Sequence, residues 1–190
     1  MLRNVYNTFD IIWLGRGGQG GVTAARIFAQ AAVHKGLYAL AIPFFGAERR
    51  GAPVFAYNRV SREVIRKRSR VKMGDLLVVL DPSLLEMYDI AKFLKNGGKV
   101  VVNSTVKDLH EKIGVKEVYC LDASGMATEI GLKLAGFPLV NMPMLGAAGR
   151  VSGMLDKDVL ARAVRESIER LVEKNIEAVN RGFDEVRRCV

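Results

Sequence analysis

Two short loops combine glycine with arginine, and these residue types favour contact with an anion or with another protein chain. The first loop, residues 15–21, reads GRGGQGG and directly follows an apolar run at residues 11–14. The second loop, residues 43–53, reads PFFGAERRGAP. Glycine lets the backbone turn sharply and come close to another group, and the planar guanidinium of arginine suits carboxylates and phosphates. We therefore expect the functional surface to lie at these loops.

The first loop has the glycine spacing of a dinucleotide-binding loop. Gly15, Gly17 and Gly20 satisfy the pattern G-x-G-x-x-G between an expected strand and an expected helix, and the amino terminus of that helix would offer free N–H groups to a phosphate. One part of the pattern is missing, because the next expected strand, residues 37–42, ends without the carboxylate that would bind a ribose.

Three interpretations of this loop are open on the residues alone. Arg16 and Gln19 place bulky polar side chains where a pyrophosphate would need room, which disfavours free-standing NAD or FAD binding. The glycines could serve only tight packing of the strand against the helix. The interpretation that fits best is a docking or ligand loop in which Arg16 and Gln19 are the working side chains.

The rest of the chain contains no familiar catalytic or metal-binding pattern. Neither a phosphate loop ending in Gly-Lys-Ser/Thr nor a G-x-S-x-G elbow occurs. His34 and His110 stand in unrelated contexts, and the cysteines at 120 and 189 fit neither a metal spacing nor a disulfide framework. We expect Cys120 to be a core thiol and Cys189 to be frayed near the chain end. No catalytic residue and no metal ligand is predicted, which favours a subunit that helps to shape a site formed mostly by other chains.

Length and composition indicate one domain over residues 1–190. A hydrophobic fraction of 49% is enough for a core, and no apolar run reaches the about 18 residues of a membrane span. Asp10 and the first loop interrupt any secretory signal at the amino terminus. With the cysteine usage, these features predict a cytoplasmic protein without a membrane partner.

The formal net charge of +9 allows several partners. The basic residues gather at Arg49, at Arg50 and over residues 62–72. They do not form a stripe with interleaved aromatic residues, so nucleic acid is not the expected partner. A solvated basic surface, an acidic protein partner and an anionic cofactor each fit this distribution.

The first half of the chain predicts alternating strands and helices. Strands at residues 11–14 and 37–42 flank a helix at 22–35, which predicts a βαβ unit with parallel pairing and a right-handed crossover. Residues 54–60 and 63–71 are expected to form an antiparallel hairpin, with Arg66, Arg68 and Arg70 on one face of its second strand.

The second half continues the alternation and then becomes helical. A strand at 76–80 ends at the connector Asp81-Pro82-Ser83, which belongs among the candidate cleft residues because it follows a strand's carboxyl end. Ser83 and Glu86 form a capping box for a helix over 83–96. The remaining expected elements are strands at 100–103 and 115–121, helices at 123–135 and 141–151, and a helical stretch from 156 to 187 with a break near 174. Asp156 is the expected cap of this last stretch.

This order of elements defines the expected fold class. We predict an α/β fold with a doubly wound, largely parallel sheet flanked by helices, similar to a Rossmann fold. An antiparallel hairpin near one edge and a helical carboxyl-terminal region complete it.

Both loops, taken in order, resemble the gamma subunits of the 2-oxoacid:ferredoxin oxidoreductases, and in particular of pyruvate:ferredoxin oxidoreductase (pyruvate synthase). The resemblance continues through residues 65–69, 78–85, 103–104 and 141–147 and covers essentially the whole chain. The PFFGAERRGAP form of the second loop resembles the pyruvate and branched-chain versions of the family.

The resemblance implies a role in a complex. Such enzymes decarboxylate a 2-oxoacid oxidatively, here pyruvate to acetyl-CoA and CO2, and pass the electrons to ferredoxin. The complex implies thiamine diphosphate, Mg2+, iron–sulfur clusters and coenzyme A, with the thiamine and the clusters on companion chains. Two cysteines cannot ligate a cluster that needs four thiolates. The implied partners are alpha, beta and delta subunits and, through them, ferredoxin; the isolated chain would be inactive, would bind no cofactor tightly, and could form a homodimer through its docking surface.

The resemblance also suggests where the site lies. Arg16, Gln19, Arg49 and Arg50 are expected to line the subunit interface or the approach of coenzyme A. Supporting loop and interface positions are Gly15, Gly17, Gly18, Gly20, Glu48, Arg66 and Arg68, with Glu48 ordering Arg49 or Arg50 in a charge-assisted pair.

Three alternatives stay open beside this interpretation. One is the gamma subunit of a branched-chain 2-oxoacid (2-oxoisovalerate) enzyme. The others are a stand-alone Rossmann-type nucleotide-binding enzyme and a basic nucleic-acid-binding module.

Overall fold

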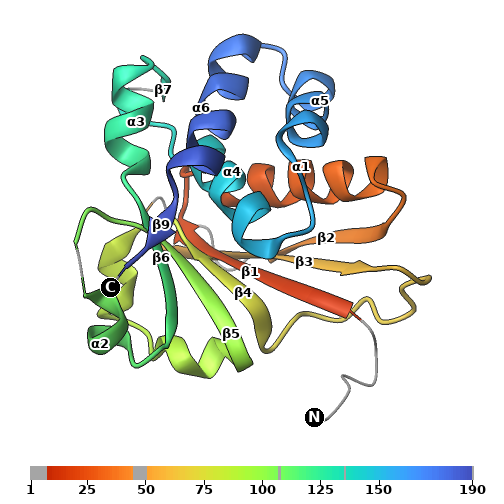
Figure 1. Cartoon of the computed structure of the whole chain (residues 1–190), viewed down its shortest axis with the longest axis vertical. Helices are drawn as coiled ribbons and strands as arrows, with labels where there is room; N and C mark the ends of the chain where they lie inside the picture. Colours follow the sequence, from red (N-terminus) through yellow and green to blue (C-terminus); the bar gives the residue numbers. More distant parts are fainter. Residues whose placement is uncertain (1–7, 45–50, 107, 135, 190) are drawn as a thin grey trace.

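A seven-stranded sheet forms the centre of the molecule (Figure 1). The computed structural model describes residues 8–44, 51–106, 108–134 and 136–189. Within them, the strand order is β2-β3-β1-β4-β5-β6-β9. The strands are β1 (Thr8–Arg16), β2 (Tyr38–Phe44), β3 (Pro53–Ser61), β4 (Gly74–Val79), β5 (Leu94–Asn103), β6 (Glu117–Leu121) and β9 (Arg187–Arg188).

Helices cover both faces of this sheet (Figure 1). The α-helices are α1 (Gly21–His34), α2 (Leu109–Ile113), α3 (Ala123–Glu129), α4 (Asn141–Ser152), α5 (Lys157–Ser167) and α6 (Val172–Glu185). Two 3-10 helices, η1 (Pro82–Leu85) and η2 (Ile90–Phe93), and a small hairpin of β7 (Lys133–Leu134) and β8 (Phe137–Pro138) complete the described elements. Helices α1, α4, α5 and α6 lie over one face, and α2 lies under the other.

Most strands of the sheet run in one direction. β1, β4, β5 and β6 pair in parallel, and β2 runs with them because β3 is antiparallel to both β2 and β1. Only β3 and β9 run against the others in the described part. The predicted fold class, a largely parallel sheet flanked by helices, is confirmed.

Alternate residues of β1 build the two cores, because successive side chains of a strand point to opposite faces. Ile11 and Trp13 pack into the core beneath α1 and α4, whereas Ile12 and Leu14 pack into the core on the other face. All four side chains are fully buried. The strand therefore reads as a continuous apolar run, as expected for a central strand covered on both sides.

The predicted parallel pairing of the first two strands is wrong. β3 lies between β1 and β2, so the crossover through α1 passes over an intervening strand. Asn58 of β3 explains this position: its side chain accepts a hydrogen bond from the Trp13 indole N–H (2.7 Å) and donates to the Ala25 carbonyl oxygen of α1 (2.8 Å). A buried amide satisfied in this way ties β3 to β1 and to α1.

The predicted hairpin of residues 54–60 and 63–71 is also wrong. The antiparallel hairpin is β2–β3, and residues 62–70 are irregular. The Arg59 guanidinium holds this segment by donating to the Lys67 carbonyl oxygen (2.8 Å). Arg66 and Arg68 are exposed to solvent. Their alternation therefore reflects solvation of a loop rather than one face of a strand.

The predicted helix over residues 83–96 is replaced by η1, η2 and the start of β5. Asp81, rather than Ser83, caps the first turn: its Oδ1 accepts from the Ser83 backbone N–H (3.0 Å). Leu84 and Ile90 pack into the core on the face of the sheet opposite α1 and α4, where Phe93 packs against other aromatic rings. The free energy gained by burying these apolar side chains outweighs the helix preference of the segment.

The carboxyl-terminal helices agree better with the sequence pattern. Asp156 caps α5, as predicted, through a hydrogen bond from the Val159 backbone N–H (3.1 Å). The break between α5 and α6 covers residues 168–171, slightly before the expected position. The predicted helix at 123–135 ends at Glu129, and the β7–β8 hairpin follows.

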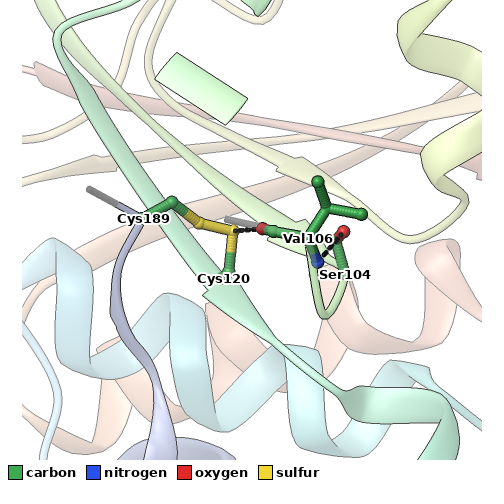
Figure 2. The surroundings of a disulfide bond; sticks show 4 residues. All are labelled: Ser104, Val106, Cys120 and Cys189. Atoms are coloured by element: carbon green, nitrogen blue, oxygen red, sulfur yellow. Dashed lines mark hydrogen bonds between the residues drawn. A yellow bond between two sulfur atoms is a disulfide. The ribbon is translucent and has the colours of Figure 1, made fainter. Parts of the chain in front are cut away.

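The expectations for the two cysteines are wrong. Cys120 of β6 and Cys189 after β9 form a disulfide with Cα atoms 5.7 Å apart, a separation typical of such bonds (Figure 2). Cys189 is buried rather than frayed, because β9 returns the end of the chain to β6. The 69-residue separation gave no pattern that could be recognised locally.

No helix within the described ranges has both the length and the apolar character needed to cross a bilayer.

Candidate functional site

The first glycine–arginine loop lies at the point where the chain changes direction across the sheet. From β1 the chain proceeds through α1 toward β2, whereas from β4 it proceeds toward β5 and β6 on the other side. The carboxyl ends of β1 and β4 therefore flank the topological switch point, which is the usual ligand crevice of an open α/β sheet. Arg16 ends β1, and Asp81 follows β4.

Arg16 fills this crevice with its own side chain. Its Nε lies 3.1 Å from Asp81 Oδ2, and its Nη2 donates to Ser83 Oγ (2.7 Å). Its Nη1 donates to the Gly51 carbonyl oxygen (2.9 Å), and the backbone N–H of Gly17 donates to the Ala52 carbonyl oxygen (3.0 Å). The first loop is thereby joined to the end of the second.

Gln19 closes the same network from the other side. Its Oε1 accepts from the Arg16 backbone N–H (2.8 Å), and its Nε2 donates to Asp81 Oδ2 (3.1 Å). We call Arg16, Gln19, Asp81 and Ser83 the switch-point network.

The Asp81 carboxylate is the charged centre of the switch-point network. Partial burial raises its pKa, but hydrogen bonds from the Ser83 side chain and backbone and from Gln19, together with the charge of Arg16, outweigh burial and lower the pKa below its usual range. Asp81 is thus held as a carboxylate. A phosphate in the crevice would meet this negative charge and would have to displace Arg16 and Gln19.

Two glycines of the loop are required by the backbone. Gly18 and Gly20 have φ angles of +94° and +77°, in the left-handed region that favours glycine. A Cβ on Gly20 would lie 2.5 Å from Asn141 Nδ2, whereas a Cβ on Gly18 would meet nothing within 4 Å. Gly20 therefore serves both the turn and the close approach of α4.

A cleft of about 600 Å³ lies beside the loop. The first turns of α1, α4 and α6 contribute to its wall, through Val22, Asn141 and Asn175 among others. Asn141 is 5% exposed, and among the described residues its Oδ1 has no hydrogen-bond partner. Leu134 and Leu171, both exposed, form part of the wall. The cleft thus combines helix amino termini with accessible apolar surface, a combination that suits a ligand or another chain.

The structure brings together only some of the predicted site residues. Arg16, Gln19 and the loop glycines lie around one crevice, whereas Glu48, Arg49 and Arg50 lie outside the described residues. Arg66 and Arg68 follow Ser61, which pairs with Thr8 at the opposite end of β1 from Arg16. A shared surface of Arg66 and Arg68 with the glycine loop remains a hypothesis.

Sequence reasoning did not foresee the pairing of Asp81 or the role of Asn141. Asp81 was expected only as a cleft residue, and the signal for its role was its place at a strand's carboxyl end. Asn141 had no local signal, because its contact with Gly20 joins residues far apart in the chain. Among the described residues, no group of three or more His, Cys, Asp or Glu side chains is placed to hold a metal ion.

The fold and the site define a Rossmann-like α/β protein whose switch-point crevice is occupied by an internal Arg–Asp pair. Residues 10–185 match the family model described as Pyruvate ferredoxin/flavodoxin oxidoreductase. The chain belongs to this family, and the resemblance to its gamma subunits is confirmed.

Individual relatives agree over nearly their full length. The "Pyruvate/ketoisovalerate oxidoreductases common subunit gamma" of Thermococcus kodakarensis is 41% identical, with 92% of this chain and 95% of the relative covered. The "Pyruvate synthase subunit PorC" of Methanothermobacter thermautotrophicus is also 41% identical, with 94% and 96% covered. The crystal structure of the pyruvate oxidoreductase subunit PORC of Thermotoga maritima superposes with a TM-score of 0.82 at 31% identity, with 97% and 99% covered.

Proposed function

We propose that this chain is the gamma subunit of a multi-subunit pyruvate:ferredoxin oxidoreductase, which converts pyruvate and coenzyme A to acetyl-CoA and CO2 and reduces ferredoxin. Relatives named as subunits of pyruvate synthase support this proposal. The reactive groups, thiamine diphosphate with Mg2+ and the iron–sulfur clusters, belong in this proposal to the alpha, beta and delta subunits. The contribution of this chain is then shape and positive charge at the edge of their site.

The observation that carries the proposed site is the junction of the two loops. Arg16 and Gly17 bind the carbonyl oxygens of Gly51 and Ala52, so the last residues of the second loop are held beside the first. We propose that Arg49 and Arg50, directly before Gly51 in the sequence, contact the companion subunits or coenzyme A. Their guanidinium groups suit the phosphates of coenzyme A and acidic protein surface alike.

Reconstitution of the complex with Arg49→Ala/Arg50→Ala tests this assignment. We expect weaker assembly or a higher KM for coenzyme A. A matched control is Arg162→Ala/Arg165→Ala, which removes the same number of arginines from the exposed surface of α5. Unchanged assembly together with an unchanged KM for coenzyme A would refute the assignment of the second loop.

A second candidate substrate is supported by one relative's name. The Thermococcus kodakarensis protein is described as common to pyruvate and ketoisovalerate oxidoreductases. We infer that this subunit is also compatible with a branched-chain 2-oxoacid enzyme, the choice of substrate being made by its companion chains. Assays of the native complex on pyruvate and on 2-oxoisovalerate distinguish the two, because activity on 2-oxoisovalerate alone would contradict the pyruvate assignment.

A stand-alone nucleotide-binding enzyme is the less favoured alternative. The Asp81 carboxylate and the Arg16 side chain occupy the crevice where a pyrophosphate would lie. We therefore expect calorimetric titration of the isolated chain with NADH to show no binding. Binding of NADH with micromolar affinity would favour the stand-alone nucleotide-binding enzyme over the gamma subunit.

A further inference from the structure

The end of the chain is fastened to the outermost parallel strand by a short set of contacts. β9 is two residues long and pairs with β6 through Cys120 opposite Arg187 and Tyr119 opposite Arg188. The Cys189 backbone N–H donates to the Val118 carbonyl oxygen (2.8 Å). The Cys120–Cys189 disulfide then links the two strands covalently (Figure 2).

β9 covers an edge of the sheet that would otherwise be free. β6 pairs with β5 on one side and with β9 on the other, so without β9 its outer N–H and C=O groups would face solvent or another chain. A two-residue strand at a chain end holds few backbone hydrogen bonds, and such termini fray unless they are tied down. The disulfide is therefore the contact that decides whether β9 stays in place.

The same contacts close one side of a second cleft. This cleft, of about 510 Å³, lies at the carboxyl ends of β5 and β6. Arg187, Arg188 and Cys189 line it from the chain end, opposite the loop at Ser104 and Val106. Movement of β9 would remove this part of the wall.

The protein already contains a hydrogen-bond acceptor for the reduced form of Cys120. Its Sγ lies 3.7 Å from the Val106 carbonyl oxygen, within reach of an S–H donor. The loop that bears this carbonyl is itself held by a hydrogen bond from the Val106 N–H to Ser104 Oγ (3.0 Å). A thiol at Cys120 would thus be accommodated without moving β6. On reduction, Cys189 and the end of the chain are the parts that move.

We propose that the Cys120–Cys189 disulfide is a redox latch that holds β9 on the edge of β6 and releases it when a protein dithiol reduces the bond. Both cysteines line the second cleft, through which a thiolate of the dithiol reaches and attacks Cys189 Sγ. The Cys120–Cys189 bond breaks, and Cys120 leaves as a thiolate that takes up a proton. The second thiol of the reductant then attacks the mixed disulfide and frees Cys189, which is protonated in turn. The dithiol is oxidised to a disulfide, and both electrons pass to the two cysteines. This proposal does not depend on the proposed function.

Hydrogen exchange on the full-length chain tests the latch, with dithiothreitol as the reductant. We expect the Cys189 amide to be protected in the oxidised protein and to lose this protection on reduction. Protection of the β1 and β4 amides should remain, because these strands lie at the centre of the sheet. Alkylation with N-ethylmaleimide after unfolding should label no cysteine in the oxidised chain and both after reduction.

Two variants separate release of the latch from general loss of structure. Cys189→Ala should show the reduced exchange pattern without reductant and should not respond to dithiothreitol, and Cys120→Ala should behave alike. Retained protection of the Cys189 amide after full reduction of the wild-type chain would make the disulfide a passive crosslink and overturn the latch. Labelling of both cysteines before reduction would overturn it as well.

Discussion

At the scale of single residues, one carboxylate organises the candidate site. Asp81 binds Arg16, Gln19 and Ser83 with one side chain, and through Arg16 it also positions the end of the second loop. A glycine-rich loop with dinucleotide-binding spacing is thereby held in place by an ion pair and hydrogen bonds. This use of the switch point is consistent with a subunit whose site is completed by other chains.

Asp81→Asn should lower stability in a pH-dependent way. The folded pKa of Asp81 is lowered, so the wild-type carboxylate contributes stability that is complete above its ordinary pKa of 3.8 and disappears as the pH falls through the folded pKa. Because the Arg16–Asp81 pair is partly exposed, we expect the variant to lose about 1 kcal/mol at neutral pH. Urea unfolding at several pH values should show the two proteins converging in acid, and a constant difference down to the lowest pH would contradict this origin.

Gly20→Ala and Gly18→Ala form a matched pair within the loop. Both positions have positive φ, so each alanine should cost about 1 kcal/mol in backbone strain. The Gly20 methyl would also meet the Asn141 side chain, which should bring the loss to about 3 kcal/mol. Chemical unfolding of both variants measures the difference, and equal losses would show that Asn141 moves freely.

At the scale of elements, α4 and α6 pack closely against each other through a glycine on each helix. A Cβ on Gly146 of α4 would contact the Val179 carbonyl oxygen, and a Cβ on Gly182 of α6 would contact the Pro143 carbonyl oxygen. The two glycines therefore let the helix backbones touch. This contact fixes the amino terminus of α4, where Asn141 meets the glycine loop.

Gly146→Ala should destabilise the protein strongly, because the new methyl meets backbone that cannot rotate away. We expect a loss of about 3 kcal/mol or more. Gly149→Ala on the same helix is the control, since its methyl would meet the flexible end of Leu160 and the helix preference of alanine offsets part of the cost. Leu160 is fully buried and has to shift, so we expect a loss of about 1 kcal/mol, clearly smaller than that of Gly146→Ala. Similar losses for both variants would contradict the proposed backbone contact.

The elements also show how far local patterns predict this fold. The predictions for β1, α1, α4 and the cap of α5 are confirmed, because each has a strong signal of its own: an apolar run, an alanine-rich helix, an apolar helix and a capping aspartate. Residues 63–71 and 83–96 also carried clear patterns. They adopt other structures because Arg59 anchors the first segment and burial of Leu84 and Ile90 decides the second.

At the scale of the whole molecule, we propose that residues 1–190 form one domain. The two cores lie on opposite faces of the same sheet, and β1 contributes Trp13 to one and Leu14 to the other. A change that separates β1 from its neighbours would expose both cores together. The domain should therefore unfold as a unit.

Thermal unfolding should show a single cooperative transition. Trp13 is the one tryptophan of the sequence and is fully buried, so its fluorescence reports the sheet directly. We expect its midpoint to coincide with that of far-ultraviolet circular dichroism. Two separated midpoints would indicate independently folding parts and contradict the single domain.

The sequence by itself determined the α/β class, the family and the position of the first loop at a strand's carboxyl end, because these depend on local runs and on motif order. Only the tertiary structure decided that β3 lies between β1 and β2, that Arg16 pairs with Asp81, and that Cys120 meets Cys189. Each of these is a contact between residues distant in the chain. Such a contact stabilises the protein only after the sheet has assembled, so it cannot be predicted from a local sequence pattern.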